Sequence, residues 1–171
     1  MPAVAYRPGR ADDALCIGVL ATHVFLDTYA TQGMRADLAR EALAVYSPDA
    51  FAARLAQPDL RFVVAEREQH LVAFLEVAAG DARPATEVEV VRLYVHPRFQ
   101  RQGIGRELLS QAERIAAAQA AAAVWLTAWS GNTRARAFYR ALGYEDVGEA
   151  SHVIEGQRYE NRVLRKPLAT G

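Results

Sequence analysis

A strand that leads through a glycine-containing turn into a long helix is the feature of this sequence that most restricts its fold. Residues 86–95 predict the strand and residues 103–119 the helix. The turn between them reads Gln100-Arg101-Gln102-Gly103-Ile104-Gly105, and its two glycines let the backbone come close to a ligand. The first N–H groups of the helix are unpaired donors at the positive end of its dipole. This segment therefore predicts a seat for a pyrophosphate.

Three arginines strengthen this prediction, and two missing features separate the turn from better-known phosphate loops. Arg98, Arg101 and Arg106 add positive charge around the turn. The third glycine of the dinucleotide-binding fingerprint is absent, and the Gly-Lys-Ser/Thr of a Walker loop is also missing. The alternative is an ordinary strand-to-helix turn that uses two glycines.

The rest of the chain predicts a mixed sheet with helices packed on its faces. Further strands are expected at residues 4–6, 61–66, 71–78, 124–129, 144–155 and 158–165, and further helices near 12–24, 35–46, from Ser47 onward and at 133–142. Asp12 or Asp13 is placed to cap the first of these helices, and Ser47-Pro48-Asp49 starts a short one. Gly143 stands where the end of a helix favours a left-handed residue.

Length and composition predict one cytoplasmic domain. The chain has 171 residues, of which 51% are hydrophobic and 23% charged, as in ordinary globular domains. Twenty basic residues balance twenty acidic ones, which removes the usual electrostatic case for nucleic acid or an anionic membrane as partner. No signal peptide or membrane-spanning run is expected. The single cysteine, Cys16, is expected in the core, and no Cys/His pattern predicts a metal site.

A second motif makes a family resemblance specific. Asn132-x-x-Ala135-x-x-Phe138-Tyr139-x-x-x-Gly143-Tyr144 follows the strand at 124–129. In this order and separation, the two motifs resemble the GNAT N-acetyltransferase superfamily, whose glycine turn reads Q/R-x-x-G-x-G/A. The resemblance implies transfer of an acetyl group from acetyl-CoA to an amine. It also implies a single α/β domain over residues 1–171, with a mostly antiparallel sheet splayed between two parallel strands and helices on both faces.

The resemblance assigns a role to each motif residue. The backbone N–H groups of the turn would bind the CoA pyrophosphate; these belong to Arg101, Gln102, Gly103, Ile104, Gly105 and Arg106. The backbone of Leu93, Tyr94 and Val95 would pair with the pantetheine arm, and Asn132 would contact that arm. Tyr139 falls where many relatives protonate the departing thiolate, while Phe138 is expected to fill the core position beside it.

Acetylation of an alkyl amine also needs a base, and Glu89 is the candidate. An amine with a pKa near ~10.4 is only about 0.04% neutral at pH 7, a deficit of about 4–5 kcal/mol. Glu89 lies at the position where several relatives carry a glutamate that acts through a water. Strand alternation places it on one face with Glu87, Val91, Leu93 and Val95, whose apolar members would raise its pKa. The alternative is a solvated strand-edge glutamate, with Glu87 as the second candidate base.

The acceptor is expected to be a polyamine or another small amine. Trp125-Leu126-x-x-Trp129-x-x-Asn132 and Gly148-x-x-Ser151-His152 are similar to bacterial polyamine (spermidine/spermine) N-acetyltransferases. A polycation needs several carboxylates, and the available ones are Asp27, Glu76, Asp81, Glu87, Glu89 and Glu145. Phe25, Tyr29 and Trp129 either line the acceptor channel or pack the core.

Two alternative functions, and a question about assembly, stay open from the sequence. The chain could acetylate a protein N-terminus or a lysine side chain, or it could be a catalytically silent acetyl-CoA-binding module. The hairpin around Gly156 is a candidate surface for a homodimer.

Overall fold

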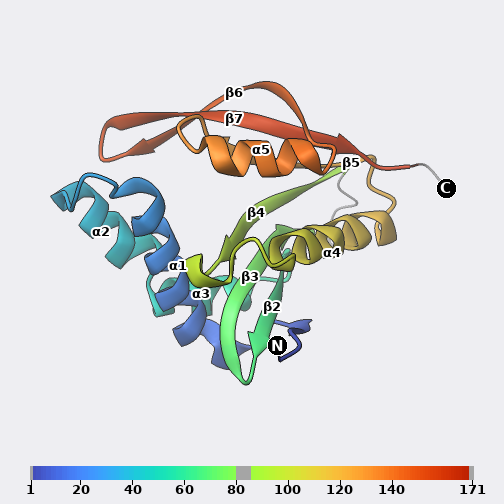
Figure 1. Ribbon diagram of the computed structural model, residues 1–171, viewed down its shortest axis with the longest axis horizontal. Coiled ribbons are helices and arrows are strands. Elements are labelled where there is room, and N and C mark those ends of the chain that lie inside the picture. The colour runs from blue at the N-terminus through green and yellow to red at the C-terminus, as the bar shows by residue number, and fades with distance from the viewer. Residues whose placement is uncertain (1, 80–85, 170–171) are drawn as a thin grey trace.

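The computed structural model of the chain describes residues 2–79 and 86–169. Within these residues, seven strands form one sheet in the order β1-β2-β3-β4-β5-β7-β6, and the β4–β5 pair is parallel while the others are antiparallel (Figure 1). The strands are β1 (Ala5–Pro8), β2 (Leu60–Arg67), β3 (His70–Ala78), β4 (Glu87–Val95), β5 (Ala123–Trp129), β6 (Glu145–Ile154) and β7 (Gln157–Pro167). The helices are α1 (Ala14–Tyr29), α2 (Ala36–Val45), α3 (Pro48–Leu55), α4 (Ile104–Ala118) and α5 (Thr133–Ala141), with short 3-10 turns η1 (Ala11–Asp13) and η2 (Pro97–Phe99). This architecture confirms the predicted fold class.

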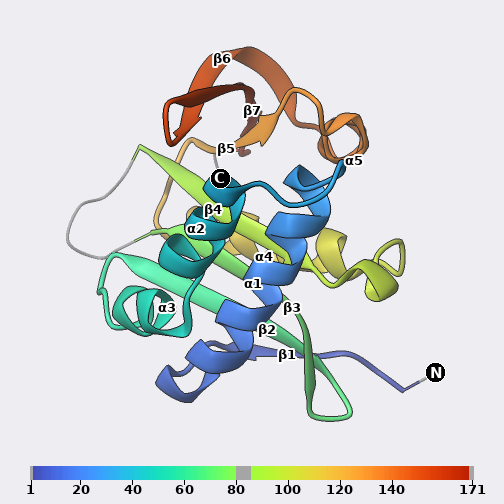
Figure 2. The same ribbon diagram turned by 90° about the vertical axis from the view of Figure 1, so that its left-hand side faces the viewer.

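The sheet separates two hydrophobic clusters, one on each face. The first lies under α4 and α5 and includes Leu108 and Tyr139, and the second lies under α1, α2 and α3 and includes Phe25 and Phe51. Strands such as β2 supply alternate residues to the two clusters, which explains their nearly continuous apolar sequence. The views in Figures 1 and 2 show α1–α3 grouped on one side and α4 and α5 on the other.

Several predicted local features are confirmed, and two are wrong. The Ser47 hydroxyl accepts from the Ala50 N–H at 3.1 Å as the N-cap of α3, and Gly143 has φ +92° after α5. The Asp13 side chain does not cap α1, because it accepts from the Arg10 N–H at 2.7 Å and pairs with Arg7. Cys16 is exposed on α1 rather than buried in the core.

The parallel strands β4 and β5 pair only over their first residues. Glu87, Val88 and Glu89 lie opposite Ala123, Val124 and Trp125, and the recorded pairing stops there within the described residues. Beyond Glu89, β4 runs away from β5, as Figure 1 shows. The sheet is thus split along part of one strand boundary, as the family resemblance implied.

A bulge in β4 changes which of its side chains share a face. Val90 lies opposite Val77 and Arg92 opposite Glu76, so Val91 is an extra, unpaired residue. Val88 and Val90 before the bulge, and Leu93 and Val95 after it, therefore belong to the same cluster under α4. The expectation that Glu89 shares a face with Leu93 and Val95 is wrong, because simple alternation does not count the bulged residue. Glu89 lies on the opposite face of the sheet, with Arg92.

Two further observations concern the outer parts of the molecule. The tip of the β6–β7 hairpin is tied to α2, because Arg40 Nη2 donates to Glu155 Oε2 at 2.6 Å. Across residues 2–79 and 86–169, none of the helices is both long and apolar enough to cross a membrane.

Candidate active site at the split between β4 and β5

The turn before α4 leaves room for a bound anion. Gly103 has φ +82° and precedes α4, and no side chain of the described residues caps this helix. A Cβ added at Gly103 would meet nothing within 4 Å among those residues. Arg101 is also left-handed, with φ +62°. The donors of the first helical turn therefore lie beside open space, which fits the pyrophosphate of acetyl-CoA.

Two glutamines hold this turn in shape. Gln100 Nε2 donates to the Val95 carbonyl at 3.1 Å, which ties the turn to the end of β4. Gln102 Nε2 donates to the Arg98 carbonyl at 3.2 Å, and its Oε1 accepts from Arg67 Nη2 at 3.0 Å. The side chain of Gln102 is thus used within the protein. The exposed side chains of Arg98, Arg101 and Arg106 supply positive charge to the same region.

Gly105 has a packing role that the sequence did not reveal. A Cβ at this position would lie 3.3 Å from Phe138 Cζ and 3.7 Å from Val95 Cγ2. Gly105 therefore lets α4 approach α5 closely, whatever it contributes to ligand binding.

The backbone of β4 has one free edge where the sheet splits. Leu93, Tyr94 and Val95 pair with β3 on one side, and the recorded β4–β5 pairs end before them. Their β5-facing edge can therefore hydrogen-bond an extended chain, as the pantetheine prediction requires. Asn132 starts α5 on the far side of the split, where its Oδ1 accepts from the Ala135 N–H at 3.1 Å. The amide nitrogen of Asn132 is not part of that cap.

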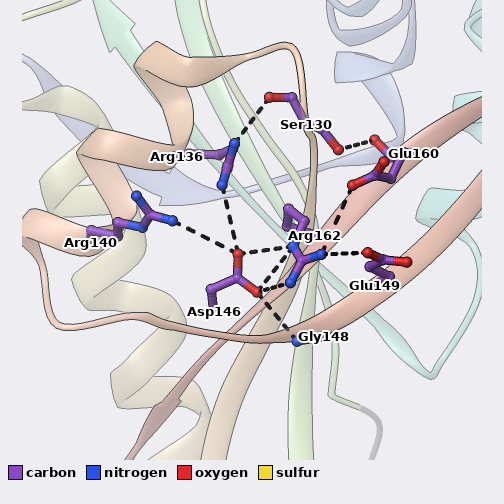
Figure 3. A network of polar contacts seen from close by, with 8 residues as sticks. All are labelled: Ser130, Arg136, Arg140, Asp146, Gly148, Glu149, Glu160 and Arg162. Atoms are coloured by element: carbon purple, nitrogen blue, oxygen red, sulfur yellow. Dashed lines mark hydrogen bonds and ion pairs between the residues drawn. The ribbon is translucent and has the colours of Figure 1, made fainter.

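A charged network fixes α5 to the β6–β7 hairpin (Figure 3). Arg162 of β7 binds Asp146 of β6 through two nitrogens, at 2.8 Å and 2.9 Å. The guanidinium groups of Arg136 and Arg140 on α5 approach the same carboxylate at 3.7 Å and 3.8 Å. Arg136 also donates to the Ser130 carbonyl at 3.1 Å. The hydrogen bonds from Arg162 lower the pKa of Asp146, so this carboxylate stays charged and holds α5 against the hairpin through Arg136 and Arg140.

Tyr139 and Phe138 exchange the environments that the sequence suggested. Tyr139 is a member of the cluster under α4, whereas Phe138 is only partly buried against it. The argument that Phe138 fills the core and leaves Tyr139 free is therefore wrong. Burial raises the pKa of Tyr139 and keeps its hydroxyl protonated. Tyr139 lies on the α4–α5 face of the sheet, the side from which the glycine turn approaches.

Glu89 approaches the split from the other face, next to a buried ion cluster. Burial and the negative charge of Glu76 raise the pKa of Glu89, while the positive charges of Arg54 and Arg92 lower it. The net effect is that the pKa of Glu89 is raised, as expected for a general base. The burial does not come from Leu93 and Val95, the apolar neighbours that strand alternation predicted, because these lie on the other face. Glu87, the second candidate, accepts two hydrogen bonds from Arg165, which lower its pKa and make it a weaker base.

Three aromatic rings bridge the split on the face of Glu89. Tyr29 of α1 lies 5.2 Å from Trp129 of β5 and 5.4 Å from Tyr159 of β7, measured between ring centroids. Of the two alternatives left open for Phe25, the structure shows core packing, since Phe25 is buried and its ring lies 5.1 Å from that of Tyr29. Tyr29 and Trp129 are only partly buried and join the two halves of the molecule.

The carboxylates proposed for a polycation do not gather beside these rings. Glu76 is fully buried between arginines, Glu87 is paired with Arg165, and Asp27 and Glu145 are exposed on α1 and β6. Asp81 lies outside the described residues. Glu89 is the member of the set that stands at the split.

The sequence missed the groups that surround Glu89. Glu76, Arg54 and Arg92 come from three elements and meet only because the bulge turns Arg92 toward Glu76. Tyr159 was also missed, since a tyrosine in a polar hairpin strand carries no signal of its partners. A bulge depends on pairing with the neighbouring strand and leaves no reliable local pattern.

Comparisons with known proteins find similar sequences. Residues 31–144, more than half of the chain, match the sequence model described as the Acetyltransferase (GNAT) family. An uncharacterized N-acetyltransferase from the pepI 3' region of Lactobacillus delbrueckii subsp. lactis is 24% identical over 153 residues, covering 87% of this chain and 88% of the relative. N-alpha-acetyltransferase RimI of Mycobacterium tuberculosis is 33% identical over 103 residues, covering 60% of this chain and 63% of the relative.

A solved structure shows the same fold. The PaiA N-acetyltransferase of Thermoplasma acidophilum, determined in complex with coenzyme A, superposes with a TM-score of 0.79 at 20% identity. The match covers 97% of this chain and 99% of the other.

Proposed function

The chain belongs to the acetyltransferase (GNAT) family and is an acetyl-CoA-dependent N-acetyltransferase, and from this premise we propose that residues 1–171 form one domain that acetylates the primary amine of a small molecule. The observation that supports the proposal is that the two candidate groups lie on opposite faces of the sheet, with Glu89 at the last β4–β5 pair. Tyr139 belongs to the cluster under α4, and Glu89 lies with Arg92 on the other face. General acid–base catalysis of this transfer needs one group that takes a proton from the amine and another that gives one to the thiolate.

The residues of the turn and of the split would hold acetyl-CoA. The backbone N–H groups of residues 101–106 would bind the pyrophosphate, with Arg98, Arg101 and Arg106 adding charge. The free edge of Leu93, Tyr94 and Val95 would pair with the pantetheine arm, which the amide nitrogen of Asn132 would contact from α5. When bound, acetyl-CoA supplies an acetyl group activated as a thioester.

The transfer would proceed by direct attack in a ternary complex. Glu89, directly or through a water, takes a proton from the amine, whose nitrogen forms a bond to the acetyl carbonyl carbon. A backbone N–H of Leu93 or Tyr94 stabilises the negative charge on the carbonyl oxygen. The carbon–sulfur bond breaks, and Tyr139 donates its proton to the departing sulfur. No covalent acetyl-enzyme is required, and Cys16 on the outside of α1 takes no part.

Polyamines and other small amines are the acceptor class that we propose. The closer sequence resemblance supports polyamines, and the rings of Tyr29, Trp129 and Tyr159 can attract an alkylammonium group. The charge of Glu89 is offset by the cluster of Arg54, Arg92 and Glu76, so the rings are the main attraction for the alkylammonium group. Within the proposed class, this arrangement favours short amines and short polyamines over long ones.

A second candidate acceptor is the N-terminus of a protein. It is favoured by the similarity to the N-alpha-acetyltransferase RimI of Mycobacterium tuberculosis, over 60% of this chain. A peptide acceptor would require an open groove along the aromatic face rather than a closed channel.

Acceptor-dependent release of free thiol from acetyl-CoA tests these proposals. The panel comprises mono-, di- and polyamines, aminoglycosides, amino acids, and short peptides with free N-termini. We expect release with small amines, and Glu89→Gln should abolish most of it without weakening acetyl-CoA binding. Release with peptides alone would establish the second candidate. Tight binding of acetyl-CoA without release for any acceptor would overturn both and identify a silent binding module.

A further inference from the structure

We propose that Glu76 is a positioning residue that, through its ion pairs with Arg54 and Arg92, controls when Glu89 can accept a proton. The inference rests on the role proposed for Glu89. The cluster consists of Glu76 of β3, Arg54 of α3 and Arg92 of β4, beside Glu89. The inference predicts that the net charge of this cluster sets the pH range in which Glu89 can act as a base.

The cluster is built around a carboxylate that water does not reach. Glu76 of β3 has 0% exposed surface and is the buried charged residue of the described core. Arg54 Nε of α3 donates to its Oε1 at 2.6 Å, and Arg92 Nη1 of β4 donates to its Oε2 at 2.7 Å. The Arg92 guanidinium also lies over the rings of Tyr46 and Phe51, at 5.4 Å and 5.5 Å from their centroids. Each carboxylate oxygen therefore has its own cation, as a buried charge requires.

The strand register brings Glu89 beside this cluster. Ala78 lies opposite Glu89, and Glu76 lies opposite Arg92. Glu76 and Ala78 are two residues apart on one strand and share a face, so Glu89 and Arg92 share that face too. Glu76 and Glu89 are thus diagonal neighbours, about 7–8 Å apart between Cα atoms in a regular sheet. The bulged Val91 is what allows Glu89 and Arg92, three positions apart, to lie on the same side.

The charges of Glu89 and of the three-residue cluster sum to zero only when Glu89 is ionised. Arg54 and Arg92 carry two positive charges and Glu76 one negative charge, which leaves one positive charge for Glu89 to balance. The two arginines favour the carboxylate form of Glu89, whereas burial and Glu76 favour the protonated form. Without Glu76, the arginines would hold Glu89 as a weak base. With Glu76 present, their effect is moderated, and Glu89 can take up and release a proton.

Other side chains near Glu89 have less effect on its protonation. Glu87 lies on the same face two positions earlier, but it is paired with Arg165 of β7, so the two charges offset each other. Trp125, opposite Glu89 on β5, carries no charge. The Tyr94 hydroxyl donates to the Tyr46 hydroxyl at 3.4 Å, and burial raises the pKa of Tyr94, so Tyr94 adds no charge beside Arg92.

The pH dependence of kcat/KM tests the proposal with two variants of opposite sign. The acidic limb of this profile reports the base of the free enzyme. Glu76→Gln removes a negative charge, so the limb should move to lower pH by about one unit. Arg54→Gln removes a positive charge, so the limb should move to higher pH by about one unit. Arg54→Lys keeps the charge and is the matched control, with an unmoved limb. Arg54→Gln leaves one oxygen of the buried Glu76 carboxylate without its cation, so a thermal melt of each variant checks that the fold is kept, and Arg54→Lys reports the effect of changing the side chain without changing its charge.

A carbon-13 NMR titration follows the protonation of the Glu89 carboxyl directly in the full chain, and its signal is assigned with Glu89→Gln. The midpoint of this titration should move in the same directions as the acidic limb, although no substrate is present. The proposal would be overturned if the acidic limb and the NMR midpoint stayed in place in Glu76→Gln and Arg54→Gln, or moved in the same direction in both. Glu76 would then be a structural residue. Failure of the proposed function looks different. In that case Glu89→Gln would leave the acidic limb of the wild-type profile intact, although the NMR shifts could still be present.

Discussion

At the scale of single residues, Tyr139 and Tyr144 are two buried tyrosines in one cluster that differ in what their hydroxyls meet. Tyr144 donates to Glu113 Oε1 at 3.1 Å, and Lys166 Nζ lies 5.7 Å from its ring centroid. The pKa of Tyr139 is raised by burial without a charged partner. The hydroxyl of Tyr144 is therefore engaged within the fold, whereas that of Tyr139 is the one proposed to donate a proton to the leaving thiolate.

Tyr139→Phe should lower kcat by about a hundredfold while acetyl-CoA binding changes little, because only the proton donor is lost. Steady-state kinetics and calorimetric binding of acetyl-CoA measure the two effects. Tyr144→Phe is the matched control: it should lower the free energy of unfolding by about 1 kcal/mol and leave kcat nearly unchanged. Equal losses of kcat in both variants would show that the Tyr139 hydroxyl has no special role.

At the scale of elements, the sequence predicted the bounds of most helices and strands but not the contacts between them. The expected strand at 86–95 is seen as β4, Glu87–Val95, because alternation and β-propensity are local properties. The bulge at Val91 was missed, since it depends on pairing with β3, and the face of Glu89 was wrong for that reason. Likewise, the glycine turn was recognised from its motif. That position 105 must be small for packing became clear only from the position of Phe138 in the structure. Local pattern fixes an element, and packing decides where its side chains point.

The close contact of α4 and α5 at Gly105 gives a prediction at the same scale. Gly105→Ala should push Phe138 away, lower the melting temperature and raise the KM for acetyl-CoA, because a Cβ would lie 3.3 Å from Phe138 Cζ. Phe138→Leu removes the ring edge that causes the clash. The double variant should therefore recover most of both losses, as thermal melts and kinetics of the four proteins can measure. Additive losses in the double variant would mean that Gly105 is needed by the ligand and not by the packing.

At the scale of the whole molecule, the two halves of the split sheet share few strand-pairing contacts and need other contacts to hold them together. The two halves of the sheet pair through three residues of each parallel strand. The rings of Tyr29, Trp129 and Tyr159 add a bridge from α1 to β5 and β7 on the face opposite the glycine turn. This cluster therefore helps to hold the two halves together, and under the proposed function it would also form one wall of the acceptor site.

The two roles of the cluster can be separated at Tyr29. Tyr29→Ala removes the ring that contacts both others, so the free energy of unfolding should fall by about 2–4 kcal/mol. The KM for the amine should rise severalfold, since the wall of its site is lost. Binding of acetyl-CoA should change little, because its proposed seat lies on the other face. Tyr29→Phe keeps the ring and should resemble the wild type in all three measurements. Denaturant melts, amine kinetics and acetyl-CoA calorimetry make the comparison. If Tyr29→Ala weakened acetyl-CoA binding as much as it raised the KM for the amine, the cluster would set the width of the split and would not line the acceptor side.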